Sequence, residues 1–172
     1  MLTIYTRELG LVSAAAQGVR LAKSKLRFAL IEYSRARIDL VRGRDIWRVT
    51  SASPVESFAL LRADHASFAV FHNICRLLER LAAGEEPNPL IFDDFLSTLG
   101  FLNRAGVTDG EREAAELILV LRILNNLGYV SENEALKRYV ADRFDPAAAP
   151  ADTLPKKTIL FEINRALRES HL

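Results

Sequence analysis

The fold of the first part of the chain is decided by residues 36–50, which read ARIDLVRGRDIWRVT. Apolar side chains alternate with polar ones before and after the middle of this stretch, and a period of two is typical of β-strands. The middle, Arg42-Gly43-Arg44-Asp45, has the glycine and the polar residues of a tight turn. These residues therefore predict a β-hairpin.

The residues before the hairpin continue the β pattern. Apolar and polar residues alternate over residues 2–7, and residues 11–17 form a second predicted strand that ends at Gly18. Residues 19–27 are basic and predict a loop, and residues 28–33 are expected to be extended and to lead into the hairpin. The first fifty residues are thus predicted to be β.

The pattern changes to helices at Ser53. The Ser53-Pro54-Val55-Glu56 stretch has the residues of a helix N-terminal capping box with proline at the first helical position, and residues 108–111 and 131–134 repeat the capping pattern. We therefore expect a helix to begin at each of these three places. The apolar spacing predicts a first helix that ends near Gly84 and further helices over residues 90–103, 108–127 and 156–168. The helix over residues 108–127 is dense in leucine and isoleucine and should be central.

Length and composition exclude several classes of protein. A chain of 172 residues with 49% hydrophobic and 26% charged residues can bury a core, so neither disorder nor a fibrous protein is indicated. The longest uncharged stretches are about ten residues, shorter than the roughly 18 needed to cross a membrane. No secretory leader opens the sequence, and the single Cys75 cannot form an internal disulfide. We expect a cytoplasmic protein.

Charge is unevenly distributed along the chain. Residues 1–50 have ten Lys/Arg against four Asp/Glu, a net charge of +6, whereas residues 51–172 have thirteen against eighteen, a net charge of −5. Clustered cations attract polyanions such as nucleic acid. The candidate DNA-binding residues lie in the basic loop and on the strand after it, and they are Arg20, Lys23, Lys25, Arg27, Arg35 and Arg37. An ordinary solvated surface is the alternative interpretation of these charges.

Aromatic residues of the same half allow two roles. Tyr5, Phe28, Tyr33 and Trp47 could stack on unpaired bases, or they could fill the core of a small β domain. The phase of the strands favours outside positions for Tyr5 and Trp47, but a structural role is the more common one for any single ring. We assign stacking to none of them from the sequence.

No set of residues in the sequence indicates catalysis. His65, His72, Cys75 and Glu79 lie near one helical face, but their apolar neighbours favour packing over metal binding. Asp93 and Asp94 fit the first turn of a helix, where the dipole favours acids. The sequence lacks a glycine-rich phosphate loop and a serine elbow. We expect no enzyme activity, no cofactor and no metal.

Residues 3–12, together with residues 16–20 and 23–26, resemble the start of the RecO family of bacterial recombination mediators. Residues 85–92 and 119–129 look like the helical part of that family, so the resemblance covers roughly residues 2–130. It implies an α+β fold with an OB-like barrel over residues 1–52, which binds nucleic acid, and an all-α domain over residues 53–172. Relative to the family, the sequence begins inside what would be the second strand, so either the real start lies upstream of Met1 or the chain is a shortened variant with an open edge. Fifty residues are few for a closed barrel.

The resemblance also implies a function. RecO-like proteins bind single-stranded and double-stranded DNA, anneal strands, and assist RecA loading together with RecR. The helical domain would bind the C-terminal tail of single-strand binding protein, and a cationic rim for such a tail could come from Arg76, Arg80, Arg104 and Arg122, which are equally well explained as solvated helix ends. Some family members hold zinc with four cysteines, which Cys75 alone cannot do.

Two other functions remain open at this point. The chain could be a protein-interaction adaptor whose incomplete OB domain does not bind DNA. It could also be an enzyme that uses the face of His65, His72, Cys75 and Glu79. DNA binding that depends on the basic loop separates the first alternative from the mediator, and metal analysis tests the second.

Overall fold

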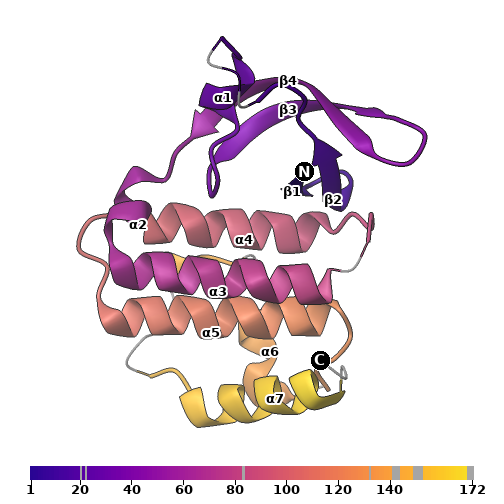
Figure 1. The fold of residues 1–172 in the computed structure, drawn as a ribbon. Coiled ribbons are helices and arrows are strands. Elements are labelled where there is room, and N and C mark those ends of the chain that lie inside the picture. Colours follow the sequence, from indigo (N-terminus) through magenta and orange to yellow (C-terminus); the bar gives the residue numbers. More distant parts are fainter. Residues whose placement is uncertain are drawn as a thin grey trace. The chain divides into compact units, whose positions relative to one another are not determined.

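A computed structural model describes residues 1–19, 21, 23–82, 84–131, 133–140, 144–148 and 153–169 (Figure 1). These residues form a four-stranded sheet, seven α-helices and one 3-10 helix, which confirms the α+β class. They divide into two compact units. We call Met1–Ala59 with Ala82–Asn88 the sheet unit, and Leu60–Leu81 with Pro89–Leu172 the helical unit. The domain limits at residues 52 and 53 stay a prediction.

The sheet unit contains four strands and one short helix. They are β1 (Leu2–Thr6), β2 (Gly10–Ala15), α1 (Leu26–Ala29), β3 (Arg35–Arg42) and β4 (Trp47–Glu56). The strand order is β1-β2-β4-β3; the β1–β2 and β3–β4 pairs are antiparallel, and β2 pairs with β4 in parallel at Ala14 and Ala15 only. This sheet of the described residues is open, so the predicted OB-like barrel is not confirmed.

The predicted hairpin is present, and its second strand is longer than expected. Ser53 and Pro54 lie in β4 opposite Arg37 and Ala36 of β3, so the predicted helix start at Ser53 is wrong, and the next helix begins at Ala59. Cross-strand pairing outweighs the local capping signal here. Proline is tolerated because this part of β4 pairs with β3 only.

The stretch before the hairpin also differs from the prediction. Residues 28–33 were expected to be extended, but Phe28 and Ala29 end helix α1, and Tyr33 has a positive φ of 57°. A positive φ turns the chain instead of extending it. Ala29 is buried, with 2% of its surface exposed, so α1 packs one side onto the sheet unit.

The helical unit consists of α3 (His65–Leu81), α4 (Pro89–Leu102), α5 (Asp109–Asn126), α6 (Glu134–Val140) and α7 (Lys156–Glu169), with the 3-10 helix Pro146–Ala148. The short helix α2 (Ala59–Ala63) precedes α3. Helix α5 contacts α3, α4, α6 and α7, so the prediction of a central helix is confirmed (Figure 1). None of the helices in the described part of the chain has the length and apolar character of a membrane span.

The ends of α5 follow the predicted signals. The Thr108 hydroxyl accepts a hydrogen bond from the backbone N–H of Glu111, and the Glu111 carboxylate accepts one from the backbone N–H of Thr108 at 2.8 Å, which is a capping box. Gly128 has a φ of 81°, as a C-terminal capping glycine requires. The helix predicted from Ser131 instead begins at Glu134. Asn133 caps it, and its side-chain oxygen accepts from the Ala135 N–H at 3.0 Å.

A half-buried ion pair holds α4, α5 and α6 together. The Arg122 Nε donates to Asp94 Oδ2 at 2.7 Å, and Arg122 Nη1 donates to the backbone oxygen of Tyr139 at 2.9 Å. The same guanidinium lies 5.3 Å from the ring centre of Phe144. Only 13% of the Arg122 side chain and 17% of the Asp94 side chain are exposed. Arg122 is therefore a structural residue and not part of an exposed cationic rim.

Replacement of Arg122 by leucine should destabilise the helical unit by about 3 kcal/mol, because the Asp94 carboxylate would stay buried without its cation. Urea unfolding followed by circular dichroism measures this loss. Arg76→Leu is the matched control, since Arg76 is an exposed arginine of α3. Equal stability of the two variants would contradict the structural role of Arg122.

The segment Ala82–Asn88 approaches β2 closely at Gly10. Gly10 has a φ of 70°, and a Cβ atom built on it would lie 2.2 Å from the backbone oxygen of Glu86. Both the positive φ and the lack of space require glycine at this position. Gly10 thus joins two parts of the sheet unit that are far apart in sequence.

Gly10→Ala should lower the free energy of unfolding by more than about 1 kcal/mol, because it combines an unfavourable φ with a backbone collision. Gly100→Ala is the control. Gly100 lies inside α4 with no atom near the position of an added Cβ, so alanine should raise helix stability by roughly 0.5 to 1 kcal/mol. Thermal melting of both variants should show a lower midpoint for Gly10→Ala and a higher midpoint for Gly100→Ala.

Candidate nucleic-acid interface

Five of the six predicted DNA-binding residues are described, and all five are exposed. Lys23 and Lys25 lie in the segment that leads into α1, Arg27 lies in α1 itself and not in the predicted loop, and Arg35 and Arg37 lie on β3. The sixth, Arg20, lies outside the described residues. Exposed and half-buried residues alternate along β3 from Arg35 to Leu40, so Arg35 and Arg37 share the outer side of this strand.

None of these five side chains forms an ion pair with a carboxylate among the described residues. Two carboxylates lie near the β3 pair, because Asp39 continues the exposed side of β3 and Glu56 is opposite Arg35 in the register. Asp39 already accepts a hydrogen bond from the Ser51 hydroxyl. The five cations are thus open to an external anion, most clearly Lys23, Lys25 and Arg27.

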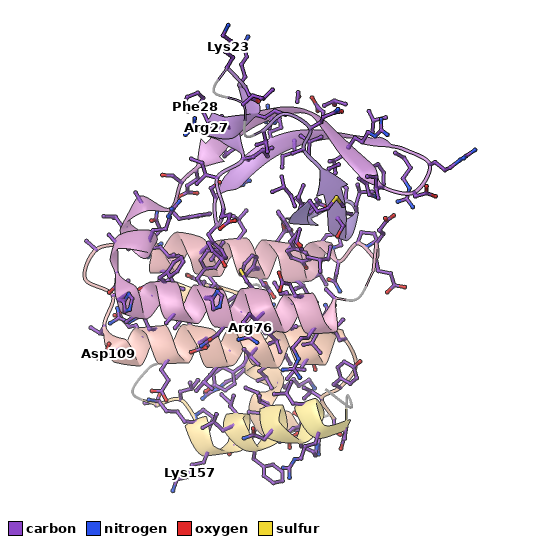
Figure 2. All side chains as sticks on the ribbon, viewed as in Figure 1. Lys23, Arg27, Phe28, Arg76, Asp109 and Lys157 are labelled. Atoms are coloured by element: carbon purple, nitrogen blue, oxygen red, sulfur yellow. The ribbon has the colours of Figure 1, made fainter. Side chains whose placement is uncertain are left out.

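The basic segment and β3 belong to the same unit. Helix α1 contacts β4, and β4 pairs with β3 along its length. Figure 2 shows Lys23 and Arg27 at the α1 end of the sheet unit. The two groups of cations therefore belong to one unit, in which α1 and β3 both contact β4.

The charge difference between the units is smaller than the sequence division indicates. The sheet unit includes Glu56, Glu85 and Glu86, so it has ten Lys/Arg against seven Asp/Glu, a net charge of +3. The helical unit has thirteen against fifteen, a net charge of −2. The sheet unit is still the positively charged part and the helical unit the negatively charged part. The difference in net charge is smaller because the acidic residues of Ala82–Asn88 belong to the sheet unit.

Glu85 holds one end of the β3–β4 hairpin. Its carboxylate forms an ion pair with Arg42 at 2.5 Å and accepts a hydrogen bond from Trp47 Nε1 at 2.9 Å. The Arg42 guanidinium lies 5.0 Å from the centre of the Trp47 ring, within range of a cation–π contact. The hydrogen bonds from Arg42 and Trp47 lower the pKa of Glu85. Arg42 is therefore occupied inside the unit, unlike the five predicted cations.

The aromatic residues of the sheet unit differ in exposure. Tyr5 is half-buried, and burial raises its pKa to about 12. Trp47 is half-buried as well and is held by Glu85, so the outside positions favoured by strand phase are wrong for both rings. Phe28 is 70% exposed and Tyr33 is 36% exposed. Phe28 thus has the most accessible ring of the four.

The helix face of His65, His72, Cys75 and Glu79 has no metal-binding geometry. No group of three or more His, Cys, Asp or Glu side chains in the described ranges is arranged to hold a metal ion. Cys75 is largely buried, and this burial, followed by the charge of Glu79, raises the pKa of its thiol to about 12. A protonated, buried thiol is neither a good ligand nor a good nucleophile.

The sequence gives no signal for the role of residues 82–88. The resemblance places residues 85–92 in the helical part, yet Glu85 and the backbone of Glu86 belong to the sheet unit. A contact between residues that are 43 positions apart cannot be predicted from local spacing.

Comparison with known proteins places these features in a family context. Residues 62–132 match the family model described as recombination protein O C terminal. The chain is 33% identical over 135 residues to the DNA repair protein RecO of Heliobacterium modesticaldum, an alignment that covers 77% of this chain and 46% of the relative.

Two further relatives have the same name. The DNA repair protein RecO of Pelotomaculum thermopropionicum is 33% identical over 129 residues, which cover 75% of this chain and 48% of the relative. That of Dehalococcoides mccartyi is 30% identical over 132 residues, which cover 77% and 51%. The chain spans about half the length of the curated relatives that it matches.

The Glu85 carboxylate should control the fluorescence of Trp47, the single tryptophan of the chain. Because the folded pKa of Glu85 is lowered, its bonds to Arg42 and Trp47 should be complete above about pH 4.3, the ordinary value, and should be lost as the pH falls through the lower folded value. Emission spectra in an acid titration should therefore show a transition that Glu85→Gln removes.

Glu86→Gln is the control for this titration, since Glu86 is an exposed neighbour whose side chain takes no part in the contact with Trp47. Its acid transition should match that of the parent protein. If Glu85→Gln keeps the same acid transition, a group other than Glu85 controls the fluorescence of Trp47.

Proposed function

Because the chain belongs to the RecO family, we propose that it acts in DNA repair and recombination by binding DNA through its sheet unit. The observation that carries this proposal is the set of five exposed cations, from Lys23 to Arg37, that form no ion pairs with other described residues. Each phosphate that they neutralise releases a condensed counterion, which supplies free energy for binding.

The proposed binding does not depend on base sequence. Lysine and arginine on an exposed loop and strand reach phosphates, and phosphate contacts have no sequence information. Single strands and duplexes both present phosphates, so the surface can contact either of them. A cationic surface also offsets the repulsion between two complementary strands, and this supports a role in strand annealing.

No covalent step is needed for this function. Binding, annealing and the exchange of one protein for another on DNA proceed through non-covalent contacts.

By resemblance to the family, the further partners are RecR, RecA and the C-terminal tail of single-strand binding protein. We propose the helical unit for the tail. Of the four arginines considered for its rim, Arg76, Arg80 and Arg104 are exposed, the last 5.6 Å from the Phe101 ring centre, whereas Arg122 is tied to Asp94.

A protein-interaction adaptor that does not bind DNA is the second candidate. The open sheet of the described residues favours it, because a closed OB barrel would be the usual nucleic-acid-binding scaffold. The two candidates differ in one measurable property, the dependence of DNA affinity on the basic segment.

Reversal of Lys23, Lys25 and Arg27 to glutamate should weaken binding of single-stranded DNA by at least about tenfold at low salt. If all three contact phosphates, the slope of log affinity against log salt should become less steep by about 2, because each contact with a single strand contributes roughly 0.7. Fluorescence anisotropy of a labelled oligonucleotide at several salt concentrations measures both quantities.

Reversal of Arg76, Arg80 and Lys157 is the matched control. These residues are exposed, lie in the helical unit, and form no ion pairs with other described residues, so the net charge changes equally. The control should keep the parental salt slope. A parent protein without measurable DNA affinity, or equal losses in both triple variants, would favour the adaptor.

A further inference from the structure

Phe28 is an aromatic side chain that the packing of the sheet unit does not use. It lies on α1 next to Ala29, which is 2% exposed, while 70% of Phe28 itself is in contact with solvent. Burial of a phenylalanine side chain stabilises a fold, and at this position most of that gain is not realised in the sheet unit. A ligand that covers the ring would recover it.

The surroundings of Phe28 are cationic. Arg27 precedes it, Lys25 occupies the N-cap position of α1 without a side-chain capping bond, and Lys23 lies two residues further back; all three are exposed. Figure 2 shows the labelled Lys23, Arg27 and Phe28 side chains at the same end of the sheet unit. The stretch from residue 21 to residue 31 contains no acidic residue. A ligand for this surface must therefore offer both anions and flat apolar rings.

We propose that Phe28 stacks on a base of single-stranded nucleic acid whose phosphates are held by Lys23, Lys25 and Arg27. This rests on the proposed function and deepens it, since it identifies unpaired strands as the substrate class of the basic segment. Single-strand-binding surfaces combine these two elements, namely cations that follow the backbone and aromatic rings that accept the bases.

The ring distinguishes single strands from duplexes. In a duplex each base is already stacked between its neighbours and hydrogen-bonded to its partner, so an exposed phenylalanine gains a stacking contact only after a base is extruded, which costs the energy of stacking and pairing. In a single strand the faces of the bases are accessible. Phenylalanine has no hydrogen-bonding group, so the contact has no base preference.

The charge decides between nucleic acid and other partners with apolar groups. Leu21 and Ile31 are 67% and 44% exposed, and together with Phe28 they could also contact an apolar protein surface or a lipid membrane. Three exposed cations that form no ion pair with another described residue favour a polyanion of regular charge spacing, which a single strand provides. Anionic vesicles are the competing polyanion, and they form a separate arm of the test.

The test compares the full chain with its Phe28→Ala variant on three labelled DNA probes of about 16 nucleotides, a length that one such surface can cover. The probes are an oligothymidine, the same strand with abasic sites, and a duplex. Phe28→Ala should lower affinity for oligothymidine between about fivefold and a hundredfold, as expected for the loss of one stacked base. Its affinity for the abasic strand and for the duplex should change less than twofold.

Phe161→Ala is the matched control, because Phe161 is 61% exposed on α7 in the helical unit, away from the basic segment in sequence. It should bind all three probes as the parent does. Phe28→Trp should restore affinity for oligothymidine, and its added fluorescence should be quenched by the oligothymidine and not by the abasic strand. The salt slope of Phe28→Ala should equal that of the parent, since no charge is removed.

Several results would overturn the stacking role. Parental affinity of Phe28→Ala for oligothymidine, with DNA binding still lost on reversal of Lys23, Lys25 and Arg27, would remove the role of the ring and leave the proposed function intact. Equal losses on the base-containing and abasic strands would show that the ring acts through folding. If Phe28→Ala lost binding to vesicles of anionic phospholipid but bound the DNA probes as the parent does, the patch would be assigned to membranes. A parent protein that binds no DNA would contradict both proposals.

Discussion

Antiparallel pairing of β3 with β4 is the interaction on which the sheet unit depends. It extends from Arg42 opposite Trp47 to Arg35 opposite Glu56, and it shifts register between Asp39 and Leu40, where Thr50 is left without an opposite residue. The Thr50 hydroxyl donates to the Asp39 backbone oxygen at 3.1 Å at this bulge. The pairing determines which cations of β3 point outward and which one reaches Glu85.

The arginines of the chain are used in two ways, and burial separates them. Arg112 and Arg122 are 13% exposed in their side chains and bind carboxylates of the helical unit, Asp64 and Asp109 for the first and Asp94 for the second. Buried guanidinium groups of this kind stabilise the fold and are not accessible to DNA. Lys23, Lys25, Arg27, Arg35 and Arg37 are exposed and form no ion pair with another described residue, so their charge is available to a ligand, whereas Arg42 of β3 is paired with Glu85.

An open sheet is compatible with nucleic-acid binding. A closed barrel fixes the positions of its loops by pairing every strand, whereas here α1 packs against β4 and residues 82–88 are held by Glu85 and by the close approach at Gly10. These contacts keep the basic segment and β3 in one unit. The proposed DNA surface therefore depends on local packing in the sheet unit and does not require closure of the barrel.

Much of the fold follows from the sequence alone. Alternation gave β1, β2 and the β3–β4 hairpin, apolar spacing gave α3, α4, α5 and α7, and the caps at Thr108 and Gly128 gave the ends of α5. These signals depend on neighbours within a few residues, and they hold wherever tertiary contacts agree with local preference. The sequence also determined which cations cluster, because their spacing is local.

Only the tertiary structure decided which of these signals prevail. Ser53 and Pro54 have a helix-start pattern, but pairing with β3 across the hairpin keeps them in a strand. The sequence could not separate Arg42 from Arg37, or Trp47 from Phe28, because the difference is a contact with Glu85, which lies some forty residues away along the chain. Exposure is a property of the packed chain, so the exposed cations and the exposed ring at α1 became visible only once the strands and the distant acidic segment were in place.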